Sequence, residues 1–134
     1  MRILLVATAL AMTAGCAGYL PPPPPGPAVQ TVANSNWRVV AVNGRATPVR
    51  GEFYVRFGTN TFGAKFGCNG IGGEYVQRGY IIDTERTAGT LMACPDMSYE
   101  NQGAAIVSLD MRANWSGPRA LRLTNRAGTI DLKR

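Results

Sequence analysis

The feature that most constrains the fold is a series of short segments in which apolar and polar residues alternate, separated by turn residues. Segments 53–57 and 62–66 each place an apolar residue at every second position, and Gly58-Thr59-Asn60 lies between them. Successive side chains of a β-strand point to opposite faces, so a period of two indicates half-buried strands. The two segments therefore predict a β-hairpin with one aromatic face.

Other segments extend this pattern on both sides of the first hairpin. Asn43-Gly44 is a strong turn signal after an apolar segment, and Arg78-Gly79 separates two more. Near the C-terminus, two leucines are predicted to face an isoleucine and a leucine across a last hairpin. The predicted strands besides the first hairpin lie at residues 37–42, 74–77, 80–83, 121–123 and 130–132.

One segment suits a long helix. Apolar residues recur at helical spacing over residues 98–111, and Asp96 or Ser98 would cap the N-terminus. Many strands and one helix predict an α+β domain: a mainly antiparallel, strongly bent or partly closed β-sheet with one packed α-helix. The glycine-rich residues 67–73 lack the Gly-Lys-Ser/Thr of a phosphate-binding loop, so we expect them to form a tight corner.

The N-terminus has the pattern of a secretory signal. Arg2 precedes an apolar run at residues 3–12, which is too short to span a bilayer, and small residues follow it. Cys16 comes directly after them, which resembles the lipobox of bacterial lipoproteins, although Thr13 stands where leucine is usual. We expect a signal peptide at residues 1–15 and a lipidated Cys16. The alternative is an ordinary signal peptide with an incidental cysteine.

A proline-rich segment follows Cys16. Pro21 to Pro25 and Pro27 favour polyproline II, which would hold a domain away from a membrane. A docking ligand for another protein is the alternative for this segment. The expected organisation is a signal peptide (1–15), a lipidated cysteine and tether (16–33) and one folded domain (34–134). By the rule for enteric lipoproteins, Ala17 implies the outer membrane, facing the periplasm.

Composition excludes several chemistries. There is no histidine, so Ser-His and Cys-His nucleophiles are impossible, and no pair of carboxylates has a catalytic spacing. We therefore expect neither an enzyme nor a cofactor. The net charge of +6 suits anionic lipid, lipopolysaccharide or nucleic acid. The arginines are scattered without a run, which favours a solvated surface, and we expect no nucleic-acid partner.

Two cysteines remain if Cys16 is lipidated. Outside the cytoplasm, an even number of cysteines favours a disulfide, here between Cys68 and Cys94. Two buried thiols are the first alternative. A redox site is disfavoured because there is no C-x-x-C, and two cysteines without histidine do not complete a zinc shell.

The order of motifs from Trp37 to Arg134 resembles the META domain (META/HslJ-like) family. The motifs are Gly67-Cys68-Asn69 followed by Gly73-x-Tyr75, then Thr90-x-Met92-Ala93-Cys94, Glu100 at the start of the helix, and Leu121-x-Leu123. The chain departs from the family pattern at Gly70-Ile71-Gly72 and at Gly103, where bulkier or polar residues are common.

The resemblance implies a small α+β fold on a secreted or lipid-anchored bacterial protein linked with envelope stress or drug tolerance. It implies no agreed catalytic residues, so the motif residues are expected to be structural: Asn69 bonding the corner, Thr90 and Met92 packing under the helix, Glu100 at its N-terminus. The expected function is a non-catalytic binding or bracing module of the bacterial cell envelope. Its partner would be an envelope protein, peptidoglycan or lipopolysaccharide. Alternatives are a small-ligand binder lined by Tyr54, Tyr75, Tyr80 or Trp115, and an inhibitor of an envelope-targeting hydrolase.

Overall fold

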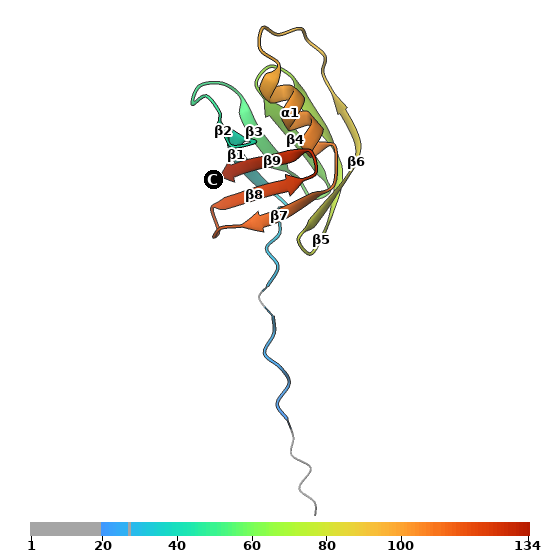
Figure 1. Cartoon of the computed structure of the whole chain (residues 1–134). Helices are drawn as coiled ribbons and strands as arrows, with labels where there is room; N and C mark the ends of the chain where they lie inside the picture. Colours follow the sequence, from blue (N-terminus) through green and yellow to red (C-terminus); the bar gives the residue numbers. More distant parts are fainter. Residues whose placement is uncertain (1–19, 27) are drawn as a thin grey trace, which may run out of the picture.

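The computed structural model describes residues 20–26 and 28–134, and shows one sheet that closes on itself with a single helix at one end (Figure 1). Cys16 and the expected signal peptide lie outside the described residues. The elements are β1 (Ser35–Val42), β2 (Arg45–Ala46), β3 (Phe53–Phe57), β4 (Thr61–Phe66), β5 (Gly70–Arg78), β6 (Ile81–Gly89), α1 (Ser98–Val107), β7 (Met111–Trp115), β8 (Ala120–Asn125) and β9 (Gly128–Lys133).

The strands form an antiparallel barrel. Neighbouring strands follow chain order from β3 to β9, and β1 pairs with both β3 and β9, which closes an eight-stranded barrel. The two-residue strand β2 only extends the edge of β1. The expected bent or partly closed sheet is confirmed, and the closure is complete because β1 bonds β3 with its first half and β9 with its second half.

The barrel interior is filled by the alternating apolar residues. The predicted first hairpin is present, with Val55 opposite Ala64 and Phe57 opposite Phe62. The last hairpin is present in the predicted register. Its leucines and isoleucine are almost fully buried, in the pairs Leu121–Leu132 and Leu123–Ile130.

The glycine-rich segment differs from its prediction. We expected residues 67–73 to form a tight corner, but β5 begins at Gly70, and only Gly67 (φ +125°) to Asn69 turn the chain. The glycines of the strand permit close backbone approach. A Cβ on Gly72 would lie 2.8 Å from the Phe62 carbonyl oxygen, and one on Gly73 would lie 2.7 Å from that of Glu85.

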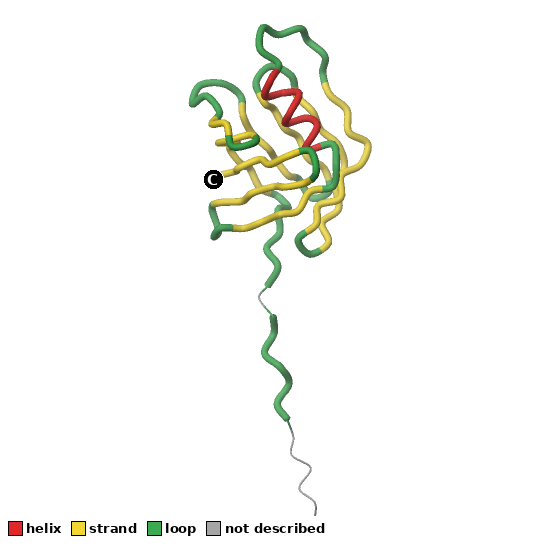
Figure 2. Tube along the Cα trace, in the orientation of Figure 1, coloured by secondary structure: helices red, strands yellow, loops and turns green. Residues whose placement is uncertain are grey.

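The helix is shorter than predicted. It ends at Val107 rather than at residue 111, because Met111 and Ala113 are buried at alternate positions and so belong to strand β7. The side chain of Asn125 donates to the Ile106 carbonyl at 2.8 Å and satisfies one of the last carbonyls of the helix. Figure 2 shows α1 and the long loop before it at one end of the barrel.

The N-terminal segment enters the barrel at the end opposite α1 (Figure 1). Val32 is fully buried there, its backbone NH donates to the Gln77 side chain, and that side chain donates to the Gln30 carbonyl. Packing thus begins before the expected start of the domain at residue 34. No helix in the described part of the chain is long and apolar enough to cross a membrane.

Candidate functional site

Most of the predicted motif residues meet at one corner, where the start of β5, the end of β6 and the N-terminus of α1 come together, whereas Tyr75, Leu121 and Leu123 lie in the barrel core. Cys68 and Asn69 lie in the turn between β4 and β5, Thr90 and Cys94 lie in the loop after β6, and Glu100 lies in the first turn of α1. The antiparallel β5–β6 pairing brings the first two groups to the same end of the sheet. Hydrogen bonds and one disulfide then connect them.

Asn69 is the centre of this corner. Its side-chain carbonyl accepts from the Met92 backbone NH at 2.7 Å and from the Thr90 hydroxyl at 3.0 Å, and its amide nitrogen donates to the Met92 carbonyl at 2.9 Å. The Thr90 hydroxyl in turn accepts from the Gly70 NH at 3.1 Å. A single amide side chain therefore fixes the path of the loop after β6.

Glu100 is a buried carboxylate, with 6% of its surface exposed. It accepts a hydrogen bond from the Asn69 backbone NH, and the Asn69 side-chain nitrogen lies 3.4 Å from its other oxygen. A negative charge in the first turn of a helix is also stabilised by the helix dipole. Glu100 therefore fastens α1 to the turn between β4 and β5.

Cys68 and Cys94 form a disulfide in the structure, with their Cα atoms 6.5 Å apart. The cysteine pair that the sequence predicted is thus at disulfide distance. Both sulfurs lie near the Glu100 carboxylate, but bonded to each other they offer no thiolate to a metal or to a redox partner. The bridge ties the turn before β5 to the loop before α1.

The remaining motif residues contribute through the backbone or the loop surface. The Gly67 NH donates to the Glu52 carbonyl at 3.0 Å, in a left-handed conformation that suits glycine. Ala93 is exposed, and Met92 is 56% exposed. Met92 is therefore not packed under the helix as the resemblance led us to expect, because its backbone, not its side chain, is the group that Asn69 holds.

A groove of about 320 Å³ opens beside this corner, between α1 and the ends of β5 and β6. Asn69 and Glu100 form its polar end, while Leu91 at its rim is 97% exposed. The apolar lining could not be predicted from the sequence, because its residues lie on β4, β5, α1 and the loop between β6 and α1 and share no periodicity. The other apolar side chains in it are Phe66, Ile71, Met97 and Ala104.

The N-terminus of α1 is held by polar contacts on its outer side. The Ser98 NH donates to the Asp96 carboxylate at 2.9 Å, and this bond, with Arg45 nearby, lowers the pKa of Asp96. The N-cap position is Met97, so neither Asp96 nor Ser98 is the capping residue that the sequence predicted. The Tyr99 hydroxyl donates to the Ala46 carbonyl at 2.6 Å, and the Arg45 guanidinium lies 3.7 Å from the centre of the Tyr99 ring. These contacts fix the helix that forms one wall of the groove.

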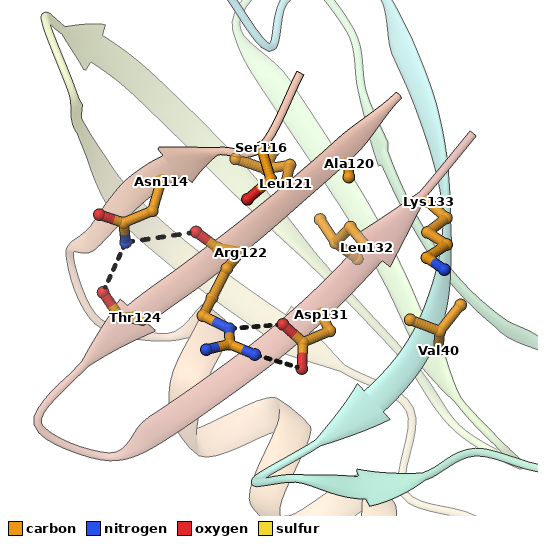
Figure 3. A pocket seen from close by; sticks show the side chains of 10 residues that line it. All are labelled: Val40, Asn114, Ser116, Ala120, Leu121, Arg122, Thr124, Asp131, Leu132 and Lys133. Atoms are coloured by element: carbon orange, nitrogen blue, oxygen red, sulfur yellow. Dashed lines mark hydrogen bonds and ion pairs between the residues drawn. The ribbon is translucent and has the colours of Figure 1, made fainter. Parts of the chain in front are cut away.

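A second hollow, of about 780 Å³, lies on the outer face of β7, β8 and β9 (Figure 3). Arg122 makes two hydrogen bonds to Asp131, which raise the pKa of the guanidinium, and Asn114 donates to Thr124 at 3.0 Å. Leu121 is the one predicted motif residue in its lining, and it is 2% exposed. Arg122, Asp131, Asn114 and Thr124 are thus bonded to one another rather than left free for a ligand.

The four aromatic residues considered for a ligand site do not share one cavity: Tyr80 and Trp115 line a hollow of about 330 Å³ beside the tether, and Tyr54 and Tyr75 lie elsewhere. Tyr75 is 3% exposed, its hydroxyl donates to the Gly58 carbonyl at 2.8 Å, and burial raises the pKa of its phenol. Trp115 packs edge-on against Trp37 with the ring centres 5.6 Å apart. Tyr80 is 41% exposed, at the tether end. Packing contacts therefore account for the burial of Tyr75 and for the partial burial of Trp115.

The structure defines a small closed antiparallel β-barrel with one helix at its end, and Asn69, Thr90 and Glu100 meet beside that helix. The META domain family model matches residues 30–133, so the chain belongs to the META domain family. The match begins before residue 34, in agreement with the buried Val32. No curated protein matches the chain.

Two solved structures are similar in fold. One is an NMR structure with a TM-score of 0.65 and 17% identity, which covers 75% of this chain and 88% of its own. The other is an NMR structure of a protein from Burkholderia xenovorans with a TM-score of 0.58 and 19% identity, which covers 86% of this chain and 98% of its own. At these identities the likeness concerns the fold alone.

Proposed function

We propose that this META-domain protein is a non-catalytic, lipid-anchored protein of the bacterial envelope, and that its domain binds or braces another envelope component. The observation that carries the proposal is the placement of the two ends of the barrel. The tether enters at one end, and the groove beside α1 lies at the other (Figure 1). A domain anchored through Cys16 would present this groove away from its own membrane.

The construction of the groove supports a binding role. Its polar end is fixed by Asn69, Glu100 and the disulfide, so the wall is formed before any partner arrives. Preorganised surfaces bind more tightly because less conformational freedom is lost on association. The exposed Leu91 at the rim offers apolar area to a partner. The partner that suits this groove best is an apolar segment of an envelope protein.

Capture from the cell envelope tests this proposal. Residues 17–134, with the disulfide oxidised and attached through the N-terminus, are exposed to detergent-solubilised envelope at low and at physiological salt. We expect one envelope protein to be retained at physiological salt, and Leu91→Asp to abolish its retention. Val49→Asp is the matched control, since Val49 is also exposed (83%) but does not line the groove.

Retention that is unchanged in Leu91→Asp, or seen only at low salt, would contradict a binding role for the groove. Anchoring is tested separately by labelling cells with a radioactive or alkyne-bearing fatty acid. We expect label in the intact chain and none in Cys16→Ser. Absence of label in the intact chain would contradict the lipoprotein part of the proposal.

A small ligand in the same groove is a second candidate, because about 320 Å³ is at the lower end of the range for ligand sites. Tryptophan fluorescence does not report on this groove, since neither Trp37 nor Trp115 lines it. NMR does: a ligand would shift the Asn69 side-chain amide and the Leu91 backbone NH. Unchanged signals across a ligand panel would leave the protein partner as the better account.

A further inference from the structure

A hollow of about 490 Å³ lies on the outer face of β1 and β3, beside the C-terminus, and four basic residues line it. The four are Arg38, Arg56, Lys133 and Arg134. All four are exposed. They come from three separate parts of the sequence, so no run of basic residues predicts the cluster.

The barrel closure assembles this cluster. Arg38 on β1 is opposite Lys133 on β9, and its neighbour on the other side is Tyr54 of β3. Two residues earlier on β1, Asn36 is opposite Arg56. Side chains two apart on a strand share a face, so these groups point from the outside of the barrel toward one region. Only the β1–β9 pairing that closes the barrel brings Lys133 to Arg38.

The basic side chains of the hollow have no ion-pair partner in the described part of the chain. None of the four basic residues forms an ion pair within the described residues, whereas Glu52, the carboxylate in the lining, is held by Lys65. In Figure 3, dashed lines join Arg122 to Asp131, and none joins Lys133 to another residue drawn. The hollow thus gathers four basic residues that have no ion pair among the described residues.

Two of the guanidinium groups are held against aromatic rings. Arg134 lies 4.2 Å from the centre of the Trp37 ring, and Arg56 lies 4.1 Å from that of Tyr54. A guanidinium that stacks on an aromatic ring keeps its N–H groups free, because they point outward in the plane of the guanidinium itself. Guanidinium groups arranged in this way suit phosphate oxygens, which accept paired hydrogen bonds from them.

We propose that this basic hollow binds the phosphate groups of an anionic lipid surface. It lies on β1, the strand into which the tether leads, so a membrane anchor would keep it within reach of such a surface. The proposal rests on the proposed function only for the presence of a membrane nearby. It concerns a different face from the groove beside α1, and the two fail independently.

Vesicle binding by the unanchored chain tests the proposal. Residues 17–134 suffice, because the core runs from Val32 to Leu132 and the barrel closes within that range. We expect sedimentation with vesicles of phosphatidylethanolamine and phosphatidylglycerol, weaker at high salt, and none with phosphatidylcholine alone. Each basic residue near an anionic surface raises partitioning roughly fivefold, so Arg38→Gln, Arg56→Gln and Lys133→Gln together should lower it about 100-fold.

The matched control removes three charges elsewhere: Arg86→Gln, Arg112→Gln and Arg126→Gln, on β6, β7 and the β8–β9 turn. We expect this control to lose far less binding. Equal losses in the two triple variants, or no binding of the parent chain to anionic vesicles, would overturn the proposal. Retention of DNA without vesicle binding would overturn it too. If a triple variant fails to fold, Lys133→Gln alone still tests the proposal. This residue is exposed, and its replacement should lower binding to anionic vesicles.

Discussion

The β7–β9 meander and the corner between β5, β6 and α1 are both well defined, but different forces hold them. In the meander, consecutive strands pair along their length, the apolar residues alternate, and the polar contacts lie on the outer face. In the corner, strand β5 is glycine-rich and bulged, and specific side chains with one disulfide connect three separate segments. A regular ladder tolerates many sequences with the same alternation, whereas the corner depends on individual residues.

The disulfide is expected to make the largest difference between the two regions. Cys68 and Cys94 are 26 residues apart, and in the chain-entropy model closing a loop of that size stabilises the fold by about 3–4 kcal/mol. Replacing both cysteines by serine should lower the free energy of unfolding in urea by about that amount. Hydrogen exchange should accelerate in residues 90–97 and not in β8 or β9. Equal acceleration in both regions would contradict a local role for the bridge.

Replacing Asn69 is expected to give the second-largest loss of stability. Asn69→Ala removes the acceptor for Met92 and Thr90 and leaves the buried Glu100 carboxylate with fewer donors, so we expect a loss of about 2–3 kcal/mol in unfolding free energy. Asn114 in the meander is the matched control, since it also donates to a side chain and to the backbone. Because β7 and β8, which carry its partners, stay joined by their own backbone pairing, Asn114→Ala should cost about 0.5 kcal/mol or less. Similar losses would mean that the corner is no more dependent on specific side chains than the meander.

Gly103 tests the packing of α1 on the barrel. A Cβ at this position would lie 2.4–2.5 Å from ring carbons of Phe66, so Gly103→Ala must displace the helix or the ring. We expect a loss of about 1–3 kcal/mol, in spite of the better helix propensity of alanine. Gly63→Ala is the control, because nothing lies within 4 Å of a Cβ there. The second change Phe66→Leu should recover part of the Gly103→Ala loss; no recovery would place the strain elsewhere.

The smallest expected effect is that of Asp96, which concerns how the stability of the fold depends on pH. Its pKa in the folded chain is below the ordinary value of 3.8, because it accepts hydrogen bonds from Ser98 and lies near Arg45. A carboxyl group with a lowered pKa stabilises the fold above the unfolded value, and this contribution disappears as the pH falls through the folded pKa. The unfolding midpoint of Asp96→Asn should therefore fall less steeply below pH 3.8 than that of the parent. The same slope for Asp96→Asn as for the parent would contradict a contribution of this carboxylate to stability.

The meander and the first hairpin could be predicted from the sequence because their information is local. Alternation at residues 53–57 and 121–123 fixes which face is buried, and a slip by one residue would expose every apolar side chain. The glycine-rich segment could not be predicted in the same way. Residues 70–73 have the composition of a loop but lie in β5, where a Cβ on Gly72 or Gly73 would be too close to a carbonyl oxygen of a neighbouring strand.

The candidate site was predicted in part. The motif residues from Cys68 to Glu100 were chosen on a family resemblance, and the structure brings Asn69, Thr90, Glu100 and the disulfide together at one corner. The apolar lining of the groove and the basic hollow were not predicted. Met97 and Ala104 are apolar helix residues like many others, and Arg38 and Lys133 are single basic residues in separate strands. Only the folded barrel brings Met97 and Ala104 into the groove, and Arg38 and Lys133 into the basic hollow.

Four features could be predicted from local sequence. They are the alternation of buried and exposed residues, most of the hairpin turns, one helix and the pair of cysteines within the domain. These depend on contacts between residues close in the chain or on a residue type with one strong chemical preference. The tertiary structure decided the closure of β1 on β9, the end of α1 at Val107, the groove and the basic hollow. Each of these joins segments far apart in the sequence, and such contacts are settled by the packing of the whole barrel rather than by any local pattern.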